Sequence, residues 1–280
     1  MHSAWLFLKE KLGRRVPEGC AGMVISVVYL GRIPYRAGLE LQQRLVAQRK
    51  AGAIGDVLVM LEHEPVLTLG RAMGRKDGGR EHVLLPEEAL RARGVEVVET
   101  NRGGDVTYHG PGQLVGYPIF DLRGDLRGPL RAGGKRLGPV DFVRQIEEAL
   151  IRTMADYGVA AMRVAGRTGV WTQPNGVVQE KKIAAIGIHV SAGVTSHGFA
   201  LNVTTDLKDF EWIVPCGIDD RTVTSLELES STPNPEVELT LERAAERVAR
   251  QFGQVFGAQM LWLESLEDLT RVTSDVLTEP

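Results

Sequence analysis

The chain has 280 residues, of which 43% are hydrophobic, enough for the core of one large α/β domain or two small ones. Its 33 Lys and Arg residues nearly balance 36 Asp and Glu residues, which gives no reason to expect nucleic acid as a partner. The chain has only two cysteines, Cys20 and Cys216, so disulfides cannot be the main source of its stability. We therefore expect a reducing compartment, the cytoplasm. The apolar run at residues 4–8 is shorter than a signal segment and no stretch reaches membrane-spanning length, so no membrane partner is expected.

The first part of the chain alternates predicted strands and helices. Residues 1–22 show no clear pattern, and we expect an N-terminal extension there, disordered or not translated, before a single domain at 23–280. Within that domain the expected strands are at 24–29, 57–61, 66–69 and 95–98, and the expected helices at 34–52 and 86–93. Interleaved strands and helices indicate the α/β class.

The second part is expected to contain two long helices with an antiparallel meander between them. Apolar residues at every third or fourth position predict helices at 140–157, with Asp141 as N-cap, and at 239–256. The meander consists of the strand pairs 170–173 with 177–179 and 182–190 with 194–203, followed by a short helix at 205–212. The sheet should therefore be mixed and largely antiparallel, with flanking helices.

A glycine-rich segment, residues 102–113, combines polar groups with an approachable backbone. Glycines let a ligand come close to backbone amide donors, and Arg102, Tyr108 and His109 offer polar groups beside that surface. Such a loop is suited to holding a carbonyl or carboxylate group. The same pattern is also typical of an ordinary turn that leads into a strand and contains a hydrogen-bonded histidine.

A second cluster joins lysines to small residues on the predicted hairpin 182–203. Its small side chains leave the room that an alkyl chain lying against a sheet would need, although they also suit plain tight packing. These small residues are Ala184, Ala185, Gly187, Gly198 and Ala200. Lys181 and Lys182 are adjacent, so at most one of them can face a site, and both can equally be solvated.

The third cluster is Cys216 between Pro215 and Gly217, a setting typical of a loop rather than a core strand. Catalytic residues collect on loops. A lone cysteine can equally be an inert buried side chain, and a neighbouring cation that stabilises the thiolate is what would make it a nucleophile.

Five motifs in register carry a family resemblance. From about Met23 to the region of Leu226, the sequence resembles the lipoyl(octanoyl) transferases. The matching motifs are Arg-Gly-Gly-x-x-Thr-x-His-x-Pro-Gly-Gln at 102–113, Gly-x-Thr-Gly-Val-Trp at 166–171, Lys-Ile-Ala-Ala-Ile-Gly-Ile at 182–188, His-Gly-x-Ala-x-Asn at 197–202 and Pro-Cys-Gly at 215–217.

The resemblance implies a fold similar to the catalytic domain of biotin and lipoate protein ligases, with an octanoyltransferase catalytic domain over 23–280. It implies that Cys216 accepts the acyl group as a thioester and that Lys182 is its catalytic partner, without a metal or a cofactor. The residues that it implies as the lining of an acyl pocket are Arg102, Gly103, Gly104, Asp105, Val106, Thr107, Tyr108, His109, Ala185, Ile186, Gly187, Gly198, Phe199 and Ala200.

The implied reaction consists of two acyl transfers and is the first step of endogenous protein lipoylation. Octanoyl-acyl carrier protein would be the donor, and the acceptors would be lipoyl domains of 2-oxoacid dehydrogenases and the glycine cleavage H protein. Exchange of one thioester for another is nearly balanced in free energy, so no ATP is needed. A cation at Lys182 would favour the Cys216 thiolate.

Two other classes of protein compete with this interpretation. One is an ATP-dependent lipoate or biotin ligase on the same fold, in which Lys182 would contact an acyl adenylate. Cys216 and the lack of a glycine- and arginine-rich adenylate loop favour the transferase. The other is a binding protein, either an acyl-carrier regulator without catalysis or a metal protein. Its candidate metal ligands, His109, His189, His197 and Cys216, have a spacing that matches no standard zinc pattern.

The segment 123–136 carries five basic residues against one acidic residue, Asp125. It is either a solvated loop or a docking element for the acidic acyl carrier protein, in which case binding should weaken with salt.

Overall fold

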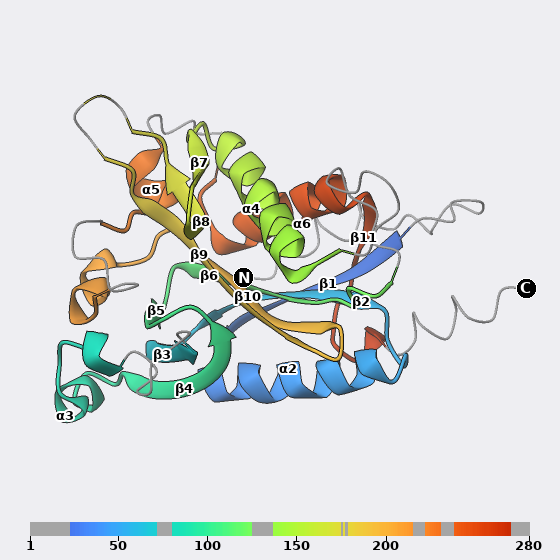
Figure 1. Cartoon of the computed structure of the whole chain (residues 1–280), viewed down its shortest axis with the longest axis horizontal. Helices are drawn as coiled ribbons and strands as arrows, with labels where there is room; N and C mark the ends of the chain where they lie inside the picture. Colours follow the sequence, from blue (N-terminus) through green and yellow to red (C-terminus); the bar gives the residue numbers. More distant parts are fainter. Residues whose placement is uncertain are drawn as a thin grey trace, which may run out of the picture.

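The computed structural model of the chain describes residues 23–71, 80–124, 137–174, 176, 179–214, 222–230 and 238–269. A large sheet crosses the centre of the molecule (Figure 1). Helices α4 (Pro139–Ala155) and α6 (Leu241–Phe256) cover one face of it, and α2 (Tyr35–Lys50) lies along the other (Figure 1). The predicted α/β class is therefore confirmed.

The large sheet has eight strands in the order β11-β1-β2-β6-β10-β9-β8-β7. Strand β1 pairs in parallel with β11 and β2, whereas all other neighbours are antiparallel, as predicted for a mixed and largely antiparallel sheet. The strands are β1 (Met23–Ile33), β2 (Asp56–His63), β6 (Gln113–Ile119), β7 (Ala161–Val164), β8 (Arg167–Thr172), β9 (Lys182–Ser191), β10 (Val194–Asn202) and β11 (Ala258–Trp262).

A second, three-stranded sheet in the order β4-β3-β5 lies beside one end of the large sheet (Figure 1). An apolar cluster around Leu67, Leu69 and Tyr108 joins this small sheet to the helices near it. The elements concerned are β3 (Val66–Arg71), β4 (Glu96–Gly103), β5 (Thr107–His109), α3 (Glu87–Arg91) and the 3-10 helices η1 (Arg80–His82) and η2 (Leu207–Trp212). One further short helix, α5 (Leu226–Glu229), follows in the chain.

Local signals explain where the long helices begin and end. Helix α4 starts at Pro139, because proline has the φ of a first helical residue and needs no hydrogen-bonded N–H there. Asp141 therefore lies in the first turn, and its predicted role as N-cap is wrong. Helix α6 is capped by the Thr240 side chain, which accepts a hydrogen bond from the Arg243 amide, and it stops at Gly257 with φ 63°.

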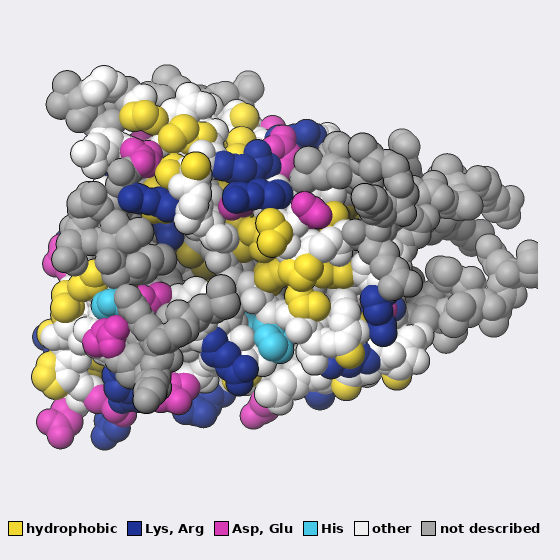
Figure 2. Space-filling view, viewed as in Figure 1, with side chains coloured by type: hydrophobic (Ala, Val, Ile, Leu, Met, Phe, Trp, Pro, Cys, Tyr) yellow, Lys and Arg dark blue, Asp and Glu magenta, His cyan; other side chains and the backbone are white. Residues whose placement is uncertain are grey.

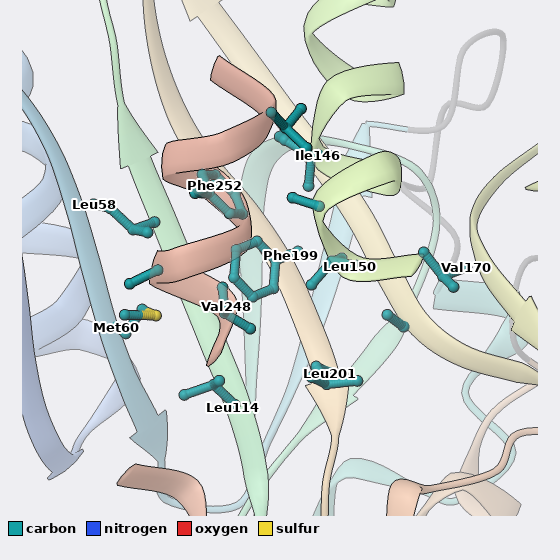
Figure 3. Close-up of a cluster of buried hydrophobic side chains, with 14 of the residues drawn as sticks. Leu58, Met60, Leu114, Ile146, Leu150, Val170, Phe199, Leu201, Val248 and Phe252 are labelled. Carbon is teal, nitrogen blue, oxygen red and sulfur yellow. The ribbon is translucent and has the colours of Figure 1, made fainter. Parts of the chain in front are cut away.

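The main hydrophobic core lies between the large sheet and the pair α4 and α6. In Figure 3, Phe199 of β10 lies between Leu150 of α4 and Phe252 and Val248 of α6. A second core packs Leu41 and Leu45 of α2 against the opposite face of the sheet. Every residue of β2 is buried, and burial on both faces explains the continuous apolar run at residues 57–61 of that strand.

The structure differs from some of the predicted strands. The meander 182–203 is confirmed as β9 and β10, but β8 pairs antiparallel with β7 and β9, and both β7 and β11 lacked a recognised signal. The predicted strand at 177–179 lies outside the described residues at 177 and 178, as do the extension 1–22 and residues 125–136 of the basic segment. In the part of the chain that is described, no helix is long and apolar enough to cross a membrane.

Candidate active site

A cavity of about 300 Å³ opens where the small sheet meets the hairpin of β9 and β10. This volume is at the lower end of the range for small-molecule sites. The residues implied for an acyl pocket that line this cavity are Arg102, Gly103, Gly104, Asp105, Val106, Thr107, His109, Ala185, Ile186, Gly187, Gly198, Phe199 and Ala200. Segments far apart in the sequence are thus brought to one place.

Tyr108 is the exception among these residues. Successive side chains of a strand point to opposite faces, so Thr107 and His109 reach the cavity while Tyr108 faces away from it. The Tyr108 ring packs edge-on against Phe210 and Trp212, at centroid distances of 5.5 and 6.0 Å. Burial, and the nearby Asp209, raise its pKa, so its hydroxyl stays protonated. The geometry gives Tyr108 a packing role in the small sheet.

The two adjacent lysines are separated by the start of β9. Lys182 lines the cavity, and its Nζ lies 4.8 Å from the ring centre of Trp171. Lys181 instead forms an ion pair with Glu229, at 3.2 Å between Nζ and Oε1. Only Lys182 therefore presents its amine on the cavity side.

Cys216 lies within residues 215–221, outside the described part of the chain. After that segment the chain runs beside Lys182, whose backbone N–H donates to the Thr222 carbonyl at 3.0 Å. The Thr224 N–H donates back to the Lys182 carbonyl at 2.9 Å, and Val223 lines the cavity. The chain that follows Cys216 is thus anchored at the first residue of β9.

Small residues face one another across β9 and β10. The register pairs Gly187 with Gly198 and Ala185 with Ala200, and all four line the cavity. The two glycines also allow close backbone approach, because a Cβ on Gly187 would clash with the Gly103 carbonyl and one on Gly198 with the Gly116 carbonyl. Ala184, in contrast, is part of the main core.

A chain of buried hydrogen bonds forms the polar wall of the cavity. Arg102 donates from Nε and Nη2 to the Thr68 hydroxyl, at 3.1 and 2.9 Å. His109 contacts Thr68 through Nε2 and donates from Nδ1 to Gln113 Oε1 at 2.7 Å. Gln113 donates at 2.9 Å to Asn202, which donates at 2.9 Å to the Thr224 carbonyl. The wall is therefore tied to the backbone beside Lys182.

Three histidines near this wall are buried and uncharged. Burial lowers the pKa of His63 to about 4, and burial together with His63 lowers that of His109 to about 3. The pKa of His197 is lowered to about 3 by burial and by Arg102. His63 accepts a hydrogen bond from the Tyr117 hydroxyl at 2.6 Å, and Tyr35 stacks on His109 with ring centres 5.9 Å apart. Neutral rings of this kind are hydrogen-bonding groups rather than cations.

His197 is held in a strained conformation. Its φ is 56°, in the left-handed region that residues other than glycine rarely occupy. Its backbone N–H donates to Gln42 at 2.7 Å, and its Nε2 bonds Asn101 at 2.6 Å. Strain maintained by several contacts is common at binding sites.

Sequence reasoning did not assign several residues that line the cavity. Trp171 ends a quoted motif, which was the available signal, whereas Arg167 stands at the variable position of that motif and carried none. Tyr35, from the start of α2, and Tyr117, within β6, carried no such signal, because only the tertiary fold brings them to the cavity.

The arrangement is suited to an acyl group with a reactive carbonyl. Apolar and small side chains from β9 and β10 form one side, and hydrogen-bond donors and acceptors form the other. Within the described ranges, no group of three or more His, Cys, Asp or Glu side chains is placed to hold a metal ion.

Comparison with known proteins identifies a protein family and several octanoyltransferases that this chain resembles. Residues 34–253 match the family model of the lipoyl protein ligase A/B catalytic domain. An octanoyltransferase of Acidobacterium capsulatum is 62% identical over 247 residues, covering 88% of this chain and 96% of that protein. One from Koribacter versatilis is 49% identical over 253 residues, covering 90% and 92%.

A solved structure shares the fold at low sequence identity. The bipartite lipoate protein ligase of Thermoplasma acidophilum superposes with a TM-score of 0.60 at 17% identity, covering 90% of this chain and 92% of that one. The expected likeness to lipoate protein ligase catalytic domains is thus confirmed at the level of the fold.

Proposed function

Because this chain belongs to the lipoyl protein ligase A/B catalytic-domain family and to its octanoyltransferases, we propose that it transfers octanoyl from acyl carrier protein to lipoyl-domain lysines through a thioester on Cys216. Its high identity to octanoyltransferases makes it an acyltransferase. The acceptors that we propose are lipoyl domains of 2-oxoacid dehydrogenases and the glycine cleavage H protein.

One observation carries the proposal. Lys182 presents its amine to a cavity lined by small and apolar side chains and by hydrogen-bonding groups, and the chain that follows Cys216 is anchored to the Lys182 backbone. A cation next to a cysteine stabilises the thiolate, which is the reactive form. The backbone contact between Lys182 and Thr222 supports such a pairing.

In the first step, the Cys216 thiolate attacks the thioester carbonyl of the octanoyl donor. A carbon–sulfur bond to Cys216 forms and the bond to the pantetheine sulfur breaks. That sulfur takes up a proton from the Lys182 ammonium and leaves as a thiol, so Lys182 becomes a neutral amine. Burying the seven carbons beyond the carbonyl contributes roughly 5 kcal/mol to binding. The small residues on β9 and β10 would receive this chain.

In the second step, the lysine of the lipoyl domain attacks the octanoyl thioester. The amine must lose a proton, and Lys182, which gave its own proton to the leaving sulfur in the first step, can accept one as general base. An amide forms and the Cys216 thiolate is regenerated. No ATP is consumed, because the thioester supplies the free energy.

The test is the intact mass of the protein after incubation with octanoyl-acyl carrier protein. We expect the wild type to gain one octanoyl group that hydroxylamine removes, and Cys216→Ser to gain none and to lose transfer. Cys20→Ser is the matched control and should still form the adduct. An adduct on Lys182→Ala but none on the wild type would contradict the roles assigned to these two residues.

The same measurement separates the competing classes of protein. A ligase would act on free octanoate and require ATP, and its reaction would not depend on Cys216. A non-catalytic acyl-carrier binding protein would bind the donor without gaining mass. Either result would replace the proposed function.

A further inference from the structure

Two hydrogen-bond donors on the cavity wall have no acceptor within the described part of the chain. Trp171 and Arg167 both lie on β8 and line the cavity. The indole Nε1 of Trp171 and the Nη1 of Arg167 are buried, and neither has a hydrogen-bond partner among the residues that the structure describes. Buried donors are almost always paired, so an unpaired couple at a cavity indicates an acceptor that arrives with a ligand.

Trp171 lies near both Arg167 and Lys182. Arg167 and Trp171 face the same side of β8, with the Arg167 Cζ 5.8 Å from the Trp171 ring centre. Gly169 lies between them in the strand and has φ 121°. A Cβ atom built on Gly169 would lie 3.6 Å from the Lys182 Cε. The Lys182 Nζ is 4.8 Å from the Trp171 ring centre. The Trp171 ring is thus close both to the Arg167 guanidinium and to the amine that we place at the reacting thioester.

The chemistry of the pair limits the ligand. A guanidinium and an indole N–H donate hydrogen bonds and accept none, so the ligand group must be an acceptor oxygen. In a pantetheine thioester, two methylene groups separate the sulfur from the first amide, whose carbonyl therefore lies within a few bonds of the reacting centre. The phosphate of the arm lies at its opposite end, far from Lys182.

We propose that Arg167 and Trp171 form a subsite for the first amide carbonyl of the donor's pantetheine arm. This inference rests on the proposed function, because it takes the donor to be a pantetheine thioester. The subsite would make the enzyme select thioesters that carry an amide at this position and would hold the leaving sulfur near Lys182. Figure 2 shows Lys and Arg side chains gathered over α4.

Two small donors of equal length test the proposal. The octanoyl thioester of N-acetylcysteamine keeps the amide, and the octanoyl thioester of pentanethiol lacks it. Thiol release is measured with a lipoyl domain as acceptor, and kcat/KM is compared between the two donors. We expect the wild type to prefer the amide donor, and Trp171→Phe and Arg167→Met each to lower kcat/KM for it by about tenfold. For the amide-free donor the change should stay below about twofold.

Trp171→Phe keeps an aromatic ring near Lys182 and removes only the N–H, so its effect reports on the hydrogen bond. Trp262→Phe on β11 and Arg243→Met on α6 are matched controls outside the cavity and should leave the donor preference unchanged. An equal loss with both donors would place the two side chains at the acyl carbonyl or at Lys182 and overturn the proposal, as would no loss with either donor. If the wild type uses neither these thioesters nor octanoyl-acyl carrier protein, the proposed function itself fails.

Discussion

Two buried amide side chains, Asn202 and Gln145, differ in their hydrogen bonding. Asn202 is 4% exposed; it accepts a hydrogen bond from Gln113 and donates one to the Thr224 carbonyl, at 2.9 Å each. Gln145 of α4 is fully buried, and neither its Oε1 nor its Nε2 has a partner within the described part of the chain. The same functional group therefore stabilises the fold at one position and weakens it at the other.

We predict opposite effects when each amide is replaced by leucine. Asn202→Leu leaves the Thr224 carbonyl unpaired and should lower the free energy of unfolding by about 2 kcal/mol. It should also slow octanoyl transfer, because Thr224 is hydrogen-bonded to the Lys182 backbone. Gln145→Leu should raise the free energy of unfolding by about 1 kcal/mol. Denaturant unfolding and a transfer assay measure both, and equal destabilisation by the two changes would contradict this account.

The hairpin of β9 and β10 is the element on which the cavity depends. Its glycines do more than make room for a ligand, since Gly187 meets the end of β4 and Gly198 meets β6. Neither position has space for a methyl group, because the nearest atoms are backbone carbonyls that cannot swing aside. Besides lining the site, Gly187 thus lets the two sheets approach each other, and Gly198 lets β10 approach β6 within the large sheet.

For this element we predict that Gly198→Ala lowers the free energy of unfolding by about 1–3 kcal/mol, because the added carbon overlaps the Gly116 carbonyl. Gly55→Ala is the control: an alanine Cβ there would meet nothing within 4 Å, and the change should stay within about 0.5 kcal/mol. Thermal or denaturant unfolding of both variants is the measurement. An unfolding midpoint for Gly198→Ala equal to that of Gly55→Ala would show that the hairpin tolerates the methyl group.

On the scale of the whole molecule, the three neutral histidines link the two sheets. His63 lies in β2 and His197 in β10 of the large sheet, while His109 lies in β5 of the small one. His63 and His109 contact each other at 6.0 Å between ring centres. All three have a pKa of about 3 to 4 in the folded protein, against an ordinary value of 6.5. Protonation of these rings is therefore opposed by the fold.

This has a consequence for stability against acid. Below pH 6.5 the unfolded chain binds a proton on each histidine, while the folded protein does not until the pH reaches about 3 to 4. The free energy of unfolding should therefore fall as the pH decreases from 6.5 to about 4, by up to about 1.4 kcal/mol per pH unit for each histidine. Denaturant unfolding across this range measures the slope.

His109→Gln should make that slope shallower by about 1.4 kcal/mol per pH unit, because glutamine does not titrate. The comparison with the wild type cancels the contribution of carboxylates such as Asp56, whose pKa is raised mainly by burial. Identical slopes in the two proteins would mean that His109 is protonated in the folded state.

Many of the helices and strands could be predicted because they depend on patterns of neighbouring residues. Apolar periodicity located the long helices and most strands, since burial on one face requires it. Strands β7 and β11 were not predicted. β7 is short, and β11 pairs with β1, which lies near the other end of the sequence. At the site, the alternation of strand side chains separates Lys181 from Lys182; applied to β5, it would also have separated Tyr108 from its two neighbours.

The sequence by itself determined the α/β class, the order of the main elements and the family, because periodicity and motifs are properties of neighbouring residues. Tertiary structure alone decided that Tyr35 stacks on His109, that Asn202 is hydrogen-bonded to Thr224, and that Lys182 lies against the Trp171 ring. These contacts join residues far apart in the chain. Their distances depend on how the two sheets and the helices pack, and no local pattern encodes that packing.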